Sequence, residues 1–418
     1  MNFLNTLLCL PMFLCFTGMQ AQTDKRAAPS LKSDPAEEDY SYLKDEESAN
    51  EYETIFAQDL KFISLNQSKT SYLSLGGHYR PRFESTTNEN NSEEDLSYYS
   101  QRLNLHGDLH LGNHIRIFTD LIHGLTSSNE PQALEDEDFA IHQAYLEFSI
   151  PTQENELAFT FGRKELDYGA ARLIARRNGP NMRRSFDLGM ADYEFRGNKI
   201  DLFYGKEVLS QFGALDNEFT LLEQDVPNPS IWGVYSDIEV HKVIGNTQLY
   251  YLGFHSNASS FSDLSGEETR HSFGIRRYGS IGKNMVFNTE FIYQFGKLAD
   301  ATISAFNVEF DYKYIVPNAS WEPQIGLKFD YSSGDRDLGD ATLNSYNPLF
   351  VNPAIYSLAA VNTPVNLNGF HPNLKVKPTE NFSLYTDYAF FFRSSNEDGL
   401  YTPPRFQNRE ATAGSDRY

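Results

Sequence analysis

The stretch FNVEFDYKY, Phe306–Tyr314, alternates throughout between an apolar or aromatic residue and a polar or charged one. Because successive side chains of a β-strand point to opposite faces, such a strand has one apolar and one charged face. The same alternation recurs in Leu73–Glu84 and in Arg102–Leu111. A soluble sandwich also alternates, but about ten or more alternating residues per strand is long for a sandwich and typical of a tilted membrane-spanning strand.

The connections between the predicted strands favour a membrane barrel more strongly. After every second strand the link is a short turn, such as Gly112 with Asn113, whereas most intervening links are longer and polar, such as Lys164–Arg184. Short periplasmic turns and longer outer loops are typical of an outer-membrane barrel, whose closure leaves no unpaired strand edge in hydrocarbon. We therefore predict an all-β fold, a transmembrane antiparallel β-barrel at residues 71–418. Its fifteen readable strands are 72–86, 97–111, 115–125, 139–150, 156–163, 185–196, 199–210, 230–241, 246–257, 269–281, 285–297, 302–316, 321–333, 365–377 and 381–394.

Composition agrees with this fold class. Of the 418 residues 14% are aromatic, with 32 Phe and 25 Tyr, and aromatic residues favour strands. No run of about 18 or more apolar residues follows the N-terminus, so the pattern disfavours a helical membrane protein. The formal net charge of −22 argues against nucleic acid as a partner of the whole surface.

The N-terminus has the pattern of a targeting segment. Residues 1–21 contain a short apolar run followed by small and polar residues, which predicts a signal peptide and export to the outer membrane of a Gram-negative bacterium. The barrel assembly machinery and outer-membrane lipid are the partners expected for such a chain. Cys9 and Cys15 both lie in this segment, so we expect no disulfide framework and no thiolate metal site in the exported protein. Residues 22–70 are predicted to form an acidic extension, poorly ordered or partly helical, to which we assign no chemistry.

A basic segment stands out against the acidic background. Seven cations lie within the 22 residues from Arg163 to Arg184, opposed there only by Glu165 and Asp167. Such a charge run is usually a solvated, salt-bridged surface loop. The other interpretation is a cation-lined site for a polyanion.

Two stretches resemble a known family. GRKELDYGAARLIARRNGPNMRRSFD, Gly162–Asp187, is similar to the signature of the alginate export family of outer-membrane barrels, and SSGDRDLGDATLNSYNPLF, Ser332–Phe350, resembles a second loop of that family. The resemblance implies an eighteen-stranded barrel that passes an anionic exopolysaccharide, without fixing alginate as the substrate. Since fifteen strands are readable and the chain stops at Tyr418 after a loop-like stretch, we expect C-terminal strands to be missing.

A polyuronate carries one carboxylate per sugar, and moving it through a narrow tube of low dielectric requires cations that replace its lost solvation. Arginine suits this task because its guanidinium is always charged and binds carboxylate in a bidentate fashion. The predicted substrate conduit is Arg80, Arg82, Arg102, Arg163, Arg172, Arg176, Arg177, Arg183, Arg184, Arg196 and Arg393. The predicted acidic partners in the lumen are Glu84, Asp108, Glu165, Asp187 and Glu194. For each of these residues the alternative is the wet interior of a purely structural barrel.

The sequence therefore predicts an outer-membrane pore for an alginate-like polyuronate. The alternative is a porin for uptake of acidic oligosaccharides, or one of broad selectivity, because sequence cannot set direction in a passive pore. We predict no catalytic residues, since neither a Gly-x-Ser-x-Gly elbow nor a compelling Ser/His pair is present. We also expect no cofactor and no metal, although Asp335, Asp337 and Asp340 offer oxygen ligands of the type that calcium prefers.

Overall fold

The computed structural model describes residues 26–87, 96–127, 134–223, 226–241, 245–261, 263–360, 362–402 and 406–409. The predicted signal peptide and the last residues of the chain up to Tyr418 lie outside these residues. In the described part, no helix is long and apolar enough to cross a membrane.

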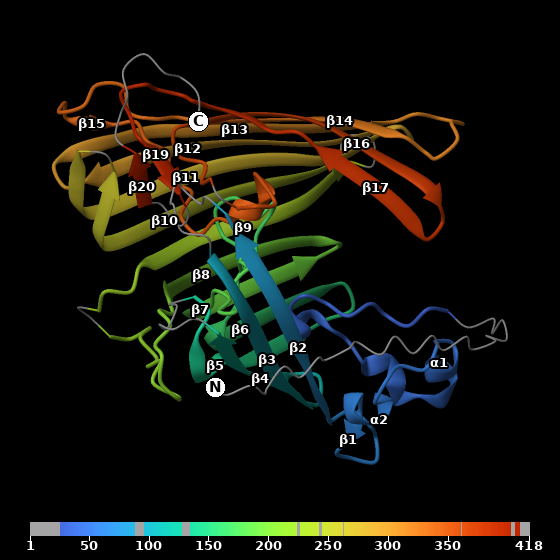
Figure 1. Ribbon diagram of the computed structural model, residues 1–418. Helices are drawn as coiled ribbons and strands as arrows, with labels where there is room; N and C mark the ends of the chain where they lie inside the picture. The colour runs from blue at the N-terminus through green and yellow to red at the C-terminus, as the bar shows by residue number, and fades with distance from the viewer. Residues whose placement is uncertain are drawn as a thin grey trace, which may run out of the picture.

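Antiparallel strands form one large curved sheet, shown in Figure 1. Its long strands are β2 (Tyr72–Thr86), β3 (Leu96–Leu111), β4 (Ile115–Thr126), β5 (Glu137–Pro151), β6 (Asn155–Lys164), β7 (Phe186–Phe195), β8 (Asn198–Glu207), β9 (Ser230–His241), β10 (Gly245–Phe261), β11 (Leu264–Ile281), β12 (Met285–Leu298), β13 (Ala301–Ile315), β14 (Gln324–Ser332) and β16 (Leu367–Thr379). The last strand is interrupted and consists of β17 (Phe382–Asp387) and β18 (Phe390–Arg393), which both pair with β16. Two-residue strands, β1 (Ile63–Ser64) and β15 (Thr342–Leu343), join the sheet, and β19 (Leu400–Thr402) and β20 (Phe406–Arg409) form a separate hairpin.

The all-β prediction is confirmed, and each of the fifteen predicted segments corresponds to a strand of this sheet. The limits of β2 and β9 are those that the sequence predicted. β10 and β11 are longer than predicted because their hairpin continues past the expected loop, where the Ser260 and Ser265 hydroxyls lie 2.9 Å apart across the strand pair. The sheet is not closed in the described residues. At one end β2 is followed by the two-residue β1, and at the other end lies the interrupted strand of β17 and β18.

The alternation of the sequence becomes the two faces of this sheet. On β13 the side chains of Phe310, Tyr312 and Tyr314 are exposed on the outer face, whereas Asn307 and Glu309 are fully buried on the inner face. Outer aromatic side chains of this kind match the lipid-facing band of a membrane barrel. The charged side chains of the strands are therefore found mainly on the inner face.

Two long connections lie on the concave side of the sheet (Figure 1). One is the segment 165–185 between β6 and β7, and the other is the segment 333–366 between β14 and β16, which contains η4 (Pro353–Ile355). Their apolar side chains join those of the inner strand face in one buried cluster that includes Leu173, Ile174 and Tyr346. The core of the molecule is thus inside the curved sheet.

The N-terminal extension is partly helical, with η1 (Pro35–Glu37), η2 (Ser41–Lys44), α1 (Glu46–Asn50) and α2 (Gln58–Lys61). The labelled helices lie beside the end of the sheet that carries β2 (Figure 1). Residues 33–37 reach further and contact the inner face of β4 and β5. The sequence did not predict this contact.

Exchanging Phe291 for Lys should impair membrane assembly, because its side chain is 45% exposed on the outer face of β12. A lysine facing lipid near the bilayer centre costs about 2 to 4 kcal/mol. The control is Asn288→Lys, because Asn288 lies on the inner face of the same strand, opposite Asp311, and lines a pocket of about 690 Å³. Heat-modifiable mobility of outer-membrane fractions measures assembly, and equal yields of both variants would contradict the assignment of faces.

Candidate functional site

The two segments that carry the family-like sequences meet inside the sheet. The Ala175 amide donates to the Phe350 carbonyl at 3.0 Å, and the Phe350 amide donates to the Leu173 carbonyl at 2.8 Å. The Phe350 ring also lies 5.1 Å from the ring of Phe186. These contacts hold the basic segment 165–185 in the lumen, so it is not a solvated surface loop.

Arg172 is a buried cation of this segment with two carboxylate partners. Its Nη1 lies 2.8 Å from Glu290 of β12, and its Nε contacts Glu309 of β13. Each acid also accepts a hydrogen bond from a tyrosine hydroxyl, Glu290 from Tyr250 and Glu309 from Tyr356. Such additional hydrogen bonds are what a buried ion pair requires to offset its desolvation. Arg172 therefore anchors the segment to the strand wall.

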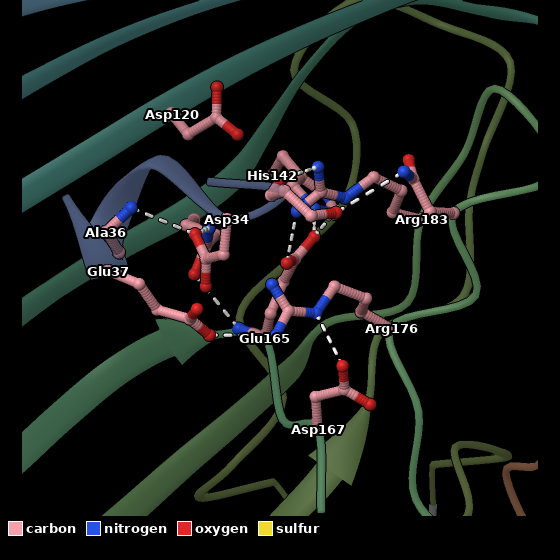
Figure 2. A network of polar contacts seen from close by, with 12 residues as sticks. Asp34, Ala36, Glu37, Asp120, His142, Glu165, Asp167, Arg176 and Arg183 are labelled. Carbon is pink, nitrogen blue, oxygen red and sulfur yellow. Dashed lines mark hydrogen bonds and ion pairs between the residues drawn. The ribbon is translucent and has the colours of Figure 1, made fainter. Parts of the chain in front are cut away.

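Arg183 forms a second buried pair, with Glu165 of the same segment (Figure 2). The Arg183 Nε donates to Glu165 Oε1 at 2.5 Å, and His142 Nε2 lies 2.6 Å from the same oxygen. Burial alone would raise the pKa of Glu165, but Arg183 and His142 outweigh it and lower that pKa to about 2. Glu165 is consequently ionised at neutral pH and neutralises Arg183.

Arg176 and Arg184 also have carboxylate partners. Arg176 lies 2.9 Å from Asp167 and 2.8 Å from Glu37 of the N-terminal extension (Figure 2). Arg184 lies 2.8 Å from Glu207 at the end of β8 and donates to the Phe350 carbonyl at 2.5 Å. Most of the positive charge of the segment is thus compensated.

Arg163 does not lie in the lumen, and its placement in the conduit was wrong. It occupies the same face of β6 as the exposed Phe159 and Phe161. There it pairs with Asp187 at 2.7 Å and donates to the carbonyls of residues 217 and 218, which cover it. The prediction that Asp187 lies in the lumen was wrong for the same reason.

Arg80, Arg82 and Arg102 face the lumen from β2 and β3 and converge on the tip of the inward segment. Arg80 donates to the Asn178 carbonyl at 2.8 Å, and Arg102 donates to the Asn178 side-chain oxygen at 2.9 Å. Arg82 pairs with Glu135 at 2.7 Å and with Glu84 at 3.3 Å. Among the described residues, no carboxylate oxygen lies within 4.0 Å of the Arg80 or Arg102 guanidinium. The positive charges of these two arginines are therefore in excess of the carboxylates that the described residues place beside them.

Arg177 is a third cation without an ion-pair partner in the described part of the chain. It is half-buried and has a left-handed backbone with φ of 52°, which costs a non-glycine residue about 1 kcal/mol or more. Burial and the neighbouring Arg184 lower its pKa to about 10, so it remains charged at neutral pH. Ion-pair stabilisation therefore does not explain why arginine occupies this position.

The other predicted residues are dispersed. Arg196 lies at the turn between β7 and β8 with its side chain 79% exposed, so its assignment to the lumen was wrong. Arg393 is buried at the end of β18 and contacts the Asp398 carbonyl at 3.3 Å. Asp108 pairs with Arg116 at 2.9 Å, and Glu194 lies 3.5 Å from Lys199.

The three aspartates considered for calcium do not converge. The Asp335 carboxylate accepts from the amide of Arg336, and the Asp340 carboxylate caps the amide of Thr342 at 2.6 Å. No group of three or more His, Cys, Asp or Glu side chains in the described ranges is placed to hold a metal ion.

Sequence reasoning missed Glu37 and Asp34, because the extension was assigned no chemistry. It also missed Glu290 and Glu207 as partners of the basic segment. Charge complementarity between an acidic extension and a basic loop in one chain was the available signal. The registers that bring these residues together are not visible in sequence.

Exchanging Glu165 for Gln should destabilise the protein by about 3 to 5 kcal/mol, since it leaves the Arg183 guanidinium buried without a carboxylate. Urea unfolding, followed by tryptophan fluorescence in detergent, measures the difference. The matched control is Glu154→Gln, because Glu154 pairs with Arg196 at an exposed turn. An equal effect of both substitutions would contradict the structural role of Glu165.

The same comparison predicts a pH dependence. Because the pKa of Glu165 is lowered from 4.5 to about 2 in the folded state, its stabilisation is present above pH 4.5 and is lost as the pH falls through about 2. The glutamine variant has no proton to gain at this position. The stability difference between wild type and Glu165→Gln should therefore narrow between pH 4.5 and about 2, whereas a constant difference would contradict the ion pair.

A solved structure of Pseudomonas aeruginosa OccK8 (OprE) superimposes with a TM-score of 0.52 at 10% identity, covering 82% of this chain and 87% of that one. A BenF-like porin from Pseudomonas fluorescens Pf-5 gives 0.49 at 10% identity, covering 77% of this chain and 82% of that one. A comparison with curated protein sequences gave no match. The family model described as alginate export matches residues 71–418, and the chain therefore belongs to the alginate export family.

Proposed function

We propose that this outer-membrane pore passes an anionic polysaccharide of the alginate-like polyuronate type past the arginines of its lumen. Family membership and the porin fold indicate a channel protein. Support for this substrate comes from the excess cations Arg80 and Arg177, which are only partly buried, whereas Arg102 is 3% exposed. A carboxylate on every sugar of a permeating chain supplies the partner that these guanidinium groups lack.

The paired arginines have a different role in this proposal. Arg172 and Arg183 are almost fully buried with their carboxylates, so they fix the shape of the inward segment and do not exchange partners with a substrate. The half-buried Arg177 and the lumen-facing Arg80 are the arginines that can bind a substrate carboxylate in this proposal. The conduit is therefore smaller than the full set of arginines that the sequence predicted.

Neighbouring acids weaken a substrate contact at Arg82. Glu84 and Glu135 lie beside Arg82, so a substrate carboxylate near this group meets both signs of charge. Conduction requires binding that is favourable enough for entry and weak enough for release. The arrangement supports stepwise passage of carboxylates from one arginine to the next.

The test is single-channel recording in planar bilayers, with the reversal potential measured in a KCl gradient before oligouronate is added. Wild type should favour chloride and be blocked by oligouronate. At an effective dielectric near 20, one guanidinium contributes on the order of 1 kcal/mol, so Arg177→Gln should weaken the block about fivefold and reduce the chloride preference.

Arg196→Gln is the control, because it removes the same charge at an exposed turn and should leave both quantities unchanged. A wild-type pore that prefers cations or is blind to oligouronate would reject the proposal. That result would favour a porin of broad selectivity. Block by neutral oligosaccharides with an affinity equal to that of oligouronate would also favour a porin of broad selectivity.

A further inference from the structure

The N-terminal segment 33–37 lies in the lumen between the strand wall and the inward segment 165–185. On one side it contacts β4 and β5, and on the other side it contacts three residues of the inward segment, Arg176, Asn178 and Arg183. It therefore occupies the space that separates these two surfaces. Figure 2 shows Asp34, Ala36 and Glu37 in this position beside Arg176, Arg183 and Glu165.

The contacts of the segment with the strand wall are polar, apart from the packing of the Ala36 side chain. Gln143 of β5 donates to Asp34 Oδ1 at 3.0 Å, and Arg116 of β4 donates to the Ala36 carbonyl at 2.7 Å. Ala36 packs in a small buried cluster with Phe118 and Tyr145. Asp34 also caps the single turn η1 by accepting from the Ala36 amide at 3.0 Å. The segment thus has a defined conformation on this wall.

The contacts with the inward segment use its arginines. Arg183 Nη1 donates to the Ser33 carbonyl at 2.7 Å, and Asn178 donates to the Ser33 hydroxyl at 3.3 Å. Arg176 Nη2 lies 2.8 Å from a Glu37 carboxylate oxygen. A carboxylate of the chain itself therefore binds an arginine next to Arg177 in the lumen.

We propose that residues 33–37 are an internal plug, and that Glu37 occupies at Arg176 the position that a carboxylate of an acidic oligosaccharide takes when the plug is displaced. The plug itself is independent of the substrate, whereas the exchange of carboxylates at Arg176 rests on the proposed function. The ligand class is a chain of uronate sugars.

The strength of the contacts favours release of this segment over release of the inward loop. The Glu37 side chain is 53% exposed, and partly exposed ion pairs of this kind contribute about 0 to 1 kcal/mol. Arg172 with Glu309 and Arg183 with Glu165 are by contrast almost completely buried. Release of the N-terminal segment also breaks the hydrogen bonds of the buried Asp34 and Ala36 to Gln143 and Arg116, but it leaves both buried ion pairs of the loop intact.

Small-ion conductance tests the plug without any substrate. In KCl, Glu37→Arg places a cation against Arg176 and should increase the open probability or the conductance, and Glu37→Gln should have a smaller effect in the same direction. The control is Glu51→Gln, which alters an exposed carboxylate of the same extension whose partner is Arg26. Heat-modifiable mobility shows that each variant is folded.

A single introduced thiol reports the position of the segment directly. Cys9 and Cys15 are the two cysteines of the sequence and lie in the expected signal peptide, so Ala36→Cys should introduce one reactive thiol into the exported protein. This thiol should react slowly with a maleimide when no other residue is changed, because Ala36 is 9% exposed. Adding Glu37→Arg should raise the labelling rate about fivefold or more. Trigalacturonate should raise the labelling rate of the protein in which Ala36→Cys is the single substitution.

The outcomes separate the two claims. Unchanged conductance of Glu37→Arg, together with unchanged maleimide labelling when Ala36→Cys is combined with it, would overturn the plug. Faster labelling of that double variant without any response to trigalacturonate would establish the plug and reject the exchange at Arg176. Chloride preference and oligouronate block of the wild-type pore are measured separately, so failure of the proposed function leaves the KCl result intact.

Discussion

Charge neutralisation inside the curved sheet is the constraint on which the inward segment 165–185 depends. Arg172 lies between Glu290 and Glu309 of adjacent strands, and Arg183 binds Glu165. A buried guanidinium without such a carboxylate would cost several kcal/mol, which exceeds what a few apolar contacts of a loop return. The segment can therefore fold inward because acids lie at matching positions, on the strands for Arg172 and within the segment itself for Arg183.

The same constraint changes the meaning of the basic stretch. In the sequence it is a cluster of free cations, but in the structure most of its members have a partner, one of them on the N-terminal extension. The remaining positive charge is displaced toward Arg177 and the strand residues Arg80 and Arg102. A pore for polyanions needs a few available cations in a rigid setting, and the buried pairs supply that rigidity.

The two faces of the sheet serve different solvents. Outward aromatic side chains such as Phe291 and Phe310 suit lipid, and the inner face holds charged and hydrogen-bonded groups. Arg163 and Asp187 are the instructive exception, because they are on the outer face at a strand end and are covered by residues of the connection between β8 and β9. Local cover, and not the lumen, explains their burial.

The sequence by itself determined the strands, the turns between them and most of their faces, with Arg163 and Asp187 as exceptions. Alternation and turn chemistry are local, and a strand such as β9 needs no distant information to be recognised. The partners of the arginines were decided only by tertiary structure. Glu309 is 137 residues from Arg172, and Glu37 is 139 residues from Arg176. Strand register and the inward path of a loop bring such residues together, and both follow from packing over the whole sheet, which a local pattern does not contain.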